Sequence, residues 1–144
     1  MDAFPFTKAE WDAVGHAALP VVNAGLVDDD VLRASHLVGL LDVLAQLRAR
    51  YGDHPVLLET EADFLEDHGE RLRLYQQAVC NAVANGLPTL SIRLSLARLL
   101  LEMGRRSAAR DELFACEGEV CEGDESERAQ WAELVAQSKS ALFG

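Results

Sequence analysis

The sequence has little of what β-sheets and membrane spans require. Leu and Ala far outnumber Ile, Tyr and Thr, aromatic residues make up 6% of the chain, and only four prolines interrupt it. No apolar run approaches the roughly 20 residues that a membrane-spanning helix needs. Because a chain of 144 residues that is 49% apolar can bury a core, we expect one folded, all-α domain.

Positive charge is also scarce. Thirteen Lys and Arg residues stand against 24 Asp and Glu, which gives a net charge of -11. Such a chain repels nucleic-acid backbones and anionic membranes, so neither is an expected partner, whereas a basic protein segment is. The first residues, Met1 to Pro5, lack the positive charge that opens a secretory signal. We therefore expect a cytoplasmic protein.

Catalytic and metal-binding motifs are missing as well. The four histidines form no H-E-x-x-H pair, and no glycine-rich phosphate loop precedes a helix. The spacing of Cys116 and Cys121 is a weak zinc signal, because no second Cys or His pair lies at finger spacing. The sequence therefore predicts a non-enzymatic chain with ordinary thiols, no cofactor and no metal site.

Helix start and stop signals divide the chain into seven segments. Thr7 and Glu10 have the spacing of a capping box, which places the start of the first helix near Lys8. Pro20 either kinks that helix or ends it. The other six helices are expected from Asp28–Asp30 to Tyr51, from Pro55 to a stop at Gly69, from there to Asn85-Gly86, from Leu90 to Met103, from Ser107 to about Val120, and from Arg128 to Leu142. Glu117 to Glu127, with six acids and two glycines, is interpreted as a solvated loop.

The segment Leu90 to Leu96 is ambiguous, because apolar and polar residues alternate in it as they would in a half-buried strand. The apolar pattern continues to Met103, however, and it is rich in Leu and poor in β-branched residues. It is also too long for a typical strand. We predict a helix that ends at Gly104 and, being apolar on nearly every side, forms the buried centre of the fold.

Self-similarity is the most specific feature of the sequence. Paired apolar residues, single alanines and glycines each recur at a spacing of 35 residues. The recurring positions are Phe64-Leu65, Leu99-Leu100 and Leu134-Val135; Ala62, Ala97 and Ala132; and Gly69 and Gly104. A fixed period of this length is typical of arrays of helical hairpins.

The segment from Leu96 to Cys116 carries the clearest copy. It has a large-small pair at its start, an inner Leu100, a turn glycine at Gly104, and the small-large spacing of a second helix at Ala109 and Leu113. In these positions it resembles a tetratricopeptide repeat, although Cys116 replaces the usual alanine. The preceding copy is degenerate, because its second helix starts the same pattern three residues too early.

The resemblance implies a seven-helix, antiparallel helical-hairpin array, a right-handed α-solenoid, within a single domain of residues 1–144. Residues 53–120 would form two tetratricopeptide-like hairpins, residues 1–52 a divergent N-terminal hairpin, and residues 125–143 a C-terminal capping helix. Two repeats alone rarely stabilise a solenoid, so the first hairpin would have to pack on them. A compact helical bundle without solenoid curvature is the structural alternative.

In this family the first helix of each hairpin lines a concave groove that receives peptide segments. Carried onto this sequence, that face consists of Glu59, Asp63, Glu66, Asp67, Leu94, Arg98, Leu101 and Glu102, together with Val56 and Ser91. Its acids share one side of the expected third helix without a cation among them, and its two leucines are expected to be exposed. This face suits a partner segment with basic and apolar residues. Acids that merely solvate the surface are the alternative.

The sequence thus predicts a protein-protein interaction module with an acidic groove. Two other interpretations stay open. One is a small dedicated chaperone or immunity-type protein for a single partner, because some bacterial secretion chaperones are short, acidic tetratricopeptide proteins. The other is a helical enzyme or metal protein. Capture of a C-terminal carboxylate by Lys and Asn, as in some members of the family, is not expected, since the groove positions offer acids, leucines and only Arg98.

Overall fold

The computed structural model describes residues 1–139, and the elements in this range are seven α-helices and one 3-10 helix, without a strand. The expected all-α class is therefore confirmed. Within the same range, no helix is long and apolar enough to cross a bilayer. The elements are α1 (Lys8–Leu26), α2 (Asp30–Tyr51), α3 (Pro55–Phe64), α4 (His68–Ala84), α5 (Leu90–Glu102), α6 (Arg106–Ala115), the 3-10 helix η1 (Glu117–Glu122) and α7 (Glu125–Lys139).

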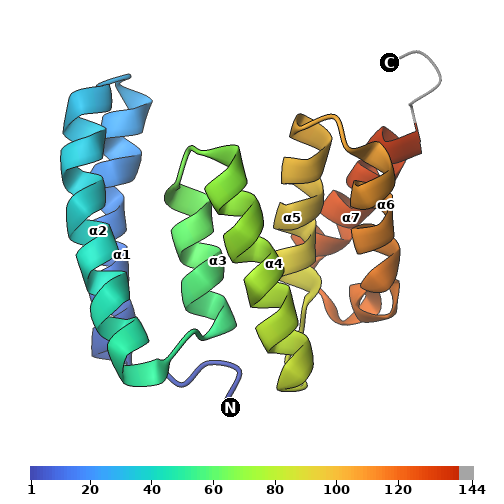
Figure 1. Ribbon diagram of the computed structural model, residues 1–144, viewed down its shortest axis with the longest axis horizontal. Coiled ribbons are helices and arrows are strands. Elements are labelled where there is room, and N and C mark those ends of the chain that lie inside the picture. The colour runs from blue at the N-terminus through green and yellow to red at the C-terminus, as the bar shows by residue number, and fades with distance from the viewer. Residues whose placement is uncertain (140–144) are drawn as a thin grey trace.

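Neighbouring helices in the chain are neighbours in space (Figure 1). α1 packs along α2, α3 along α4, and α5 along α6, and each of these pairs contacts the next through α2 and α3 or through α4 and α5. α7 packs against both α5 and α6. As a result α5 is enclosed by α4, α6 and α7, which confirms the prediction that it is the central buried helix.

Several helix ends have the caps that the sequence signals predict. Thr7 Oγ1 accepts a hydrogen bond from the Glu10 amide at 3.1 Å, and Glu10 Oε1 accepts one from the Thr7 amide at 2.9 Å, which completes the capping box. Gly52 after α2 and Gly104 after α5 have φ angles of 74° and 76°. Glycine adopts this left-handed conformation without the strain that a Cβ atom causes, so both residues end their helices.

The connection between α3 and α4 differs from the prediction. α3 ends at Phe64, and Gly69 lies inside α4 instead of closing the helix before it. The cause is Asp67, whose carboxylate accepts a hydrogen bond from the Glu70 amide at 2.9 Å and so starts α4 before the glycine. Leu65 is extended, which turns the chain away from the axis of α3.

The end of α6 was also predicted incorrectly. The helix stops at Ala115 instead of Val120, and the chain continues as η1, a segment expected to belong partly to the helix and partly to a solvated loop. Hydrogen bonds in η1 join an amide to the carbonyl three residues earlier in the chain, as from the Glu119 amide to the Cys116 carbonyl at 2.9 Å. Tightening of the last turn in this way satisfies carbonyls that the α-helix leaves without donors.

Two further boundaries concern the first and last helices. α1 continues past Pro20 to Leu26, so the proline does not end the helix. α7 starts at Glu125, earlier than the expected Arg128. The expected end of this helix at Leu142, and of the capping segment at residue 143, lies outside the described residues.

Two hydrophobic clusters hold the helices together, and α3 belongs to both. Leu58 and Ala62 face the larger cluster, which is built from α3 to α7, whereas Leu57 faces the smaller one. The other buried residues of the smaller cluster are Phe6, Val14, Val21, Leu40, Leu44 and Leu47. The α1–α2 pair is therefore joined to the rest of the molecule mainly through one short helix.

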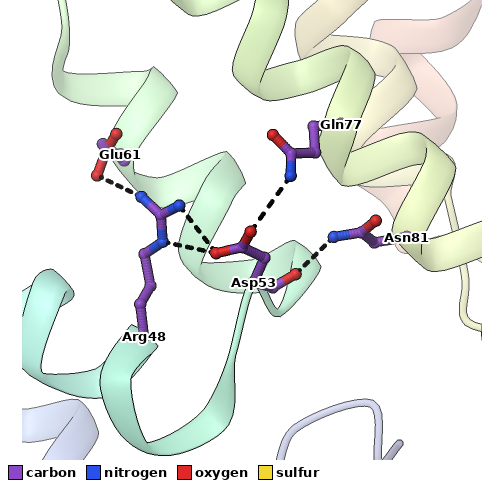
Figure 2. Close-up of polar contacts among 5 residues, drawn as sticks. All are labelled: Arg48, Asp53, Glu61, Gln77 and Asn81. Carbon is purple, nitrogen blue, oxygen red and sulfur yellow. Dashed lines mark hydrogen bonds and ion pairs between the residues drawn. The ribbon is translucent and has the colours of Figure 1, made fainter.

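A polar network reinforces this joint (Figure 2). Arg48 at the end of α2 donates to Asp53 Oδ1 through Nε at 3.0 Å and Nη2 at 2.8 Å, and it contacts Glu61 of α3 at 3.5 Å. From α4, Gln77 donates to Asp53 Oδ2 at 3.3 Å and Asn81 donates to the Asp53 carbonyl at 2.8 Å. From the turn between α2 and α3, Asp53 thus binds side chains of α2 and α4, and Arg48 extends the network to α3.

We expect Asp53→Ala to weaken the attachment of the α1–α2 pair more than it weakens the rest of the fold. The change removes the acceptor of Arg48 and Gln77, and a loss of about 1 kcal/mol is typical for partly exposed bonds of this kind. Trp11 lies in the smaller cluster and Trp131 in the larger one, and they are the only two tryptophans. Denaturant unfolding followed by fluorescence in Trp11→Phe and Trp131→Phe backgrounds separates the two ends.

The midpoint reported by Trp11 should fall further than the midpoint reported by Trp131. Asp42→Ala, which removes an exposed carboxylate of α2, is the matched control and should shift neither. Equal shifts at the two tryptophans in the Asp53 variant would contradict this role of the network.

Candidate functional site

The first turns of α3, α5 and α7 meet around a hollow of about 330 Å³, which we call the acidic hollow. Four carboxylates line it, and its lining residues include no Lys or Arg. The residues that line it are Ala3, His54, Pro55, Val56, Glu59, Leu87, Pro88, Leu90, Ser91, Ile92, Glu119, Glu122, Gly123 and Glu127. Helix N-termini carry partial positive charge, which accounts for the gathering of acids at this end of the molecule.

Two of the four carboxylates have a structural role. Glu119 Oε1 accepts hydrogen bonds from the amides of Thr89 and Leu90 at 2.7 and 3.2 Å, and its Oε2 accepts one from the Thr89 hydroxyl at 2.5 Å. It therefore supplies acceptors for the first amides of α5 from a distant part of the chain. Glu127 Oε1 accepts from the Asp124 amide at 3.1 Å, and Asp124 Oδ1 accepts from the Glu127 amide at 2.7 Å. This reciprocal pair caps α7.

Glu59 is the carboxylate whose chemistry the hollow changes most. It lies half-buried on α3, and Ser91 of α5 donates to its Oε2 at 2.6 Å. Burial raises the pKa of Glu59 to about 7, the Ser91 hydrogen bond opposes this, and the negative charges of Asp63 and Glu127 add to it. The carboxylate is thus desolvated among other acids, and its charged form lacks a compensating cation.

Asp63 lies one turn further along α3 on the same side. Its Oδ1 accepts a hydrogen bond from the hydroxyl of the buried Tyr75 at 2.5 Å. Desolvation raises the pKa of the Asp63 carboxyl, whereas Tyr75, Arg71 and Arg98 act in the opposite direction. Burial and the same contact raise the pKa of the Tyr75 hydroxyl, so it acts as a hydrogen-bond donor. Asp63 is consequently held in place by α4.

A second hollow, of about 390 Å³, lies between α5 and α7. Leu101 and Leu134 give it an apolar floor, and its polar lining residues are Arg98, Glu102, Gln130, Glu133 and Gln137. Arg98 Nη2 donates to Gln130 Oε1 at 2.6 Å, and this hydrogen bond links α5 to α7. Of the predicted groove residues, Arg98, Leu101 and Glu102 therefore meet here, and Glu59 and Ser91 meet in the acidic hollow.

Other predicted groove residues lie elsewhere. Glu66 and Asp67 are in the connection after α3, so Glu66 does not share a helical face with Glu59. Glu66 binds Arg33 of α2 at 3.1 Å, and Asp67 caps α4. The prediction that these two residues belong to α3 is wrong. The spacing of apolar and charged residues in α3 continues up to Asp67, although this acid caps the next helix.

Leu94 was also predicted wrongly, since it is buried in the larger cluster with 3% of its surface exposed, not exposed in a groove. Leu101 is half-buried. Glu102, at the end of α5, lies 3.9 Å from Arg71 and 3.8 Å from His68. α4, α6 and α7 all cover α5, which leaves only one of the two leucines near the surface.

Sequence reasoning missed the acids that η1 and α7 contribute to the acidic hollow. Glu119, Glu122 and Glu127 all fall in a stretch interpreted as a solvated loop. A partial signal was present, because Asp124 and Glu127 have the spacing of a capping box. The contact between Glu119 and Thr89 spans 30 residues, and no local pattern encodes it.

Metal and thiol chemistry receive no support from the part of the chain that the structure describes. Residues 1–139 hold no group of three or more His, Cys, Asp or Glu arranged to bind a metal ion. The three cysteines are free thiols, of which Cys80 and Cys121 are exposed. Burial raises the pKa of the Cys116 thiol to about 11, so it is protonated at neutral pH and is a poor nucleophile.

Comparison of the chain with protein-family models, with curated proteins and with solved structures gives no match. The residues of the two hollows are therefore the features from which a function can be inferred.

We expect Glu59→Gln to change how stability depends on pH. A carboxyl with a pKa near 7 in the folded chain and 4.5 as its reference value binds protons more tightly when folded. Its favourable contribution is present below pH 4.5 and is lost as the pH rises through 7. Relative to the glutamine variant, the wild type should lose about 1–3 kcal/mol over this interval, at ~1.4 kcal/mol per pKa unit.

Urea unfolding of both proteins between pH 4 and pH 8 measures this difference. Carbon-13 NMR titration of the glutamate side chains gives the pKa of Glu59 directly. Ser91→Ala removes the hydrogen bond that opposes the shift and should raise this pKa further. Titration of Glu59 near its reference value in the folded protein would contradict the account of the acidic hollow.

Proposed function

We propose that the chain is a tetratricopeptide-like protein-protein interaction module without enzymatic activity. In this proposal, the face formed by α3, α5 and α7 holds a partner segment in which a basic residue stands beside apolar ones. The observation that carries the proposal is the desolvated Glu59 carboxylate in a hollow lined by three further acids and by no Lys or Arg.

A cationic side chain is the occupant that the charges favour. A buried carboxylate costs free energy unless a positive charge or several hydrogen bonds compensate it, and here the charged groups that act on Glu59 are negative. A Lys or Arg that entered the hollow would stabilise the charged form of Glu59 and lower its pKa. Binding would thus release a proton near neutral pH.

The walls of the acidic hollow favour the aliphatic part of such a side chain. Val56, Leu87, Leu90 and Ile92 line it together with the acids. Lys and Arg carry three or four methylene groups that pack on apolar surface while the charged end reaches polar groups. A hollow with both kinds of lining therefore suits a long basic side chain better than a bare metal ion.

The second hollow extends the face along α5. Arg98 lies within electrostatic reach of Asp63, so charged groups continue from the acidic hollow towards Leu101 and Leu134. An extended segment that placed a basic residue in the first hollow could place an apolar residue over these leucines. Each peptide residue in extended form spans about 3.3 Å, so a few residues would connect the two positions.

Several features support the tetratricopeptide-like arrangement and its antiparallel hairpins. Consecutive helices pack in pairs, and α7 covers α5 and α6 where a capping helix would lie. The repeated positions Ala62 and Ala97 are fully buried, and Gly104 ends its helix. The third alanine of the period, Ala132, is exposed, so α7 departs from the pattern.

Selection of displayed random peptides on the purified chain tests the proposed function. We expect the selected sequences to share a Lys or Arg next to an aliphatic residue. For synthetic versions of these peptides, Glu59→Gln combined with Glu122→Gln should weaken binding about 10-fold, which corresponds to ~1.4 kcal/mol. Isothermal titration calorimetry in two buffers of different ionisation enthalpy also reports the proton released on binding.

Asp111→Lys is the matched control, because it changes the net charge by the same amount on the exposed side of α6, outside both hollows. It should leave the affinity nearly unchanged at physiological salt, where charges beyond about 8 Å are screened. Selected peptides without a basic residue, or an equal loss in the two variants, would reject the acidic hollow as the binding site.

A further inference from the structure

A surface of different character lies on the α1–α2 pair, shown in blue and cyan at one end of the molecule in Figure 1. Residues 13–27 contain no Asp, Glu, Lys or Arg, although 26% of the chain is charged. Along α2, the exposed positions Ala34, Ser35, Ala45 and Ala49 are small and uncharged. A helical pair that ends a charged protein would normally carry charged residues on its outer side.

Large aliphatic side chains are exposed on this pair. Of the eleven exposed large hydrophobic residues in the described part of the chain, seven lie between residues 19 and 38. Those with the greatest exposure are Val31 at 83%, Leu26 at 77% and Val27 at 71%. They surround the turn between α1 and α2, which extends past the end of α3 in Figure 1.

The same pair also contains a hollow of about 470 Å³ between its two helices. Apolar residues supply most of its lining, and the polar groups in it are one amide and two imidazole side chains. The residues that line it are His16, Leu19, Pro20, Asn23, Ala24, Val27, Leu32 and His36. The surface therefore combines protruding side chains at the turn with a recess a short distance along the helices.

The size of this surface is near that of a stable interface. Leu19, Leu26, Val27, Val31, Leu32 and Val38 together leave on the order of 600 Å² exposed, which is the upper limit for the largest apolar patch of a typical monomer. A standard interface buries about 800 Å² on each partner. The aliphatic residues and the alanines beside them thus supply enough area for one.

We infer that the outer side of the α1–α2 pair is a dimerisation surface, which pairs with the same surface of a second copy of this chain. A two-fold interface needs one patch that carries both projections and recesses, and this pair carries both. Two copies would then form a four-helix arrangement in which Leu26 and Val31 of one copy approach the hollow of the other.

The charge distribution favours a second copy over most other occupants. Each chain carries a net charge of -11, so contact through the acidic face would bring many carboxylates together. The α1–α2 surface reduces this cost, because residues 13–27 are uncharged and the acidic hollow lies on α3, α5 and α7. The exposed acids nearest to its apolar residues are Asp28, Asp29 and Asp30 in the turn and Asp42 on α2. Dimerisation here also leaves both hollows of the proposed binding face open.

Sedimentation equilibrium and light scattering of the full chain from about 1 to about 100 µM test the inference. A reducing agent is needed, because Cys80 and Cys121 are exposed and could link copies covalently. We expect a concentration-dependent dimer. Leu19→Glu combined with Val27→Glu should weaken dimerisation at least ~100-fold, since buried, unpaired carboxylates are costly. Leu19→Ala combined with Val27→Ala should weaken dimerisation less, because these changes remove apolar surface without adding charge.

Val83→Glu combined with Phe114→Glu is the matched control, because it places two acids on exposed apolar positions of α4 and α6. This variant should dimerise like the wild type, and circular dichroism should show the same helix content in all four proteins. A wild type that stays monomeric up to the highest concentration would overturn the inference, as would a dimer that survives the Leu19→Glu and Val27→Glu changes or one that the control weakens equally.

Discussion

The burial of α5 on nearly every side is the constraint on which the rest of the fold depends. Its leucines point in all directions around the axis, and each Å² of apolar surface left in water costs roughly 25 cal/mol, so α4, α6 and α7 must cover it. Thr89 and Leu90 at its start are buried, and Glu119 accepts the hydrogen bonds of their amides. The acidic hollow follows from this arrangement, because the helices that enclose α5 bring their N-terminal ends, and the acids that cap them, to one place.

The molecule is polarised along its length. Carboxylates gather where α3, α5 and α7 begin, whereas residues 13–27 of the α1–α2 pair carry no charged side chain. α3 stands between these regions, with Leu57 on one side and Leu58 on the other, and Asp53 fixes its start to both neighbours. One ten-residue helix therefore connects the proposed dimerisation surface with the proposed binding face.

Local signals were sufficient for most of the helices and insufficient for the site. Thr7, Gly52 and Gly104 act on the backbone within a few residues, so their pattern could be interpreted directly. Glu59 and Ser91 were assigned to one face by the resemblance to helical-hairpin repeats, and the structure brings them into contact. Leu94 and Glu66 were misplaced, because burial of α5 on an additional side and the start of α4 at Asp67 depend on packing between distant segments. The same holds for Glu119, whose partner lies in another helix.

The pairing of each helix with its neighbours in the chain also bears on how the protein is made. Among the described residues, the smaller cluster contains none beyond Phe64, so every side chain it needs has been synthesised while more than half of the chain is still to be added. Helical contacts between near neighbours form in microseconds to milliseconds, far faster than translation adds residues. We therefore expect the N-terminal end to fold during synthesis and to provide, through α3, the surface on which the later helices assemble.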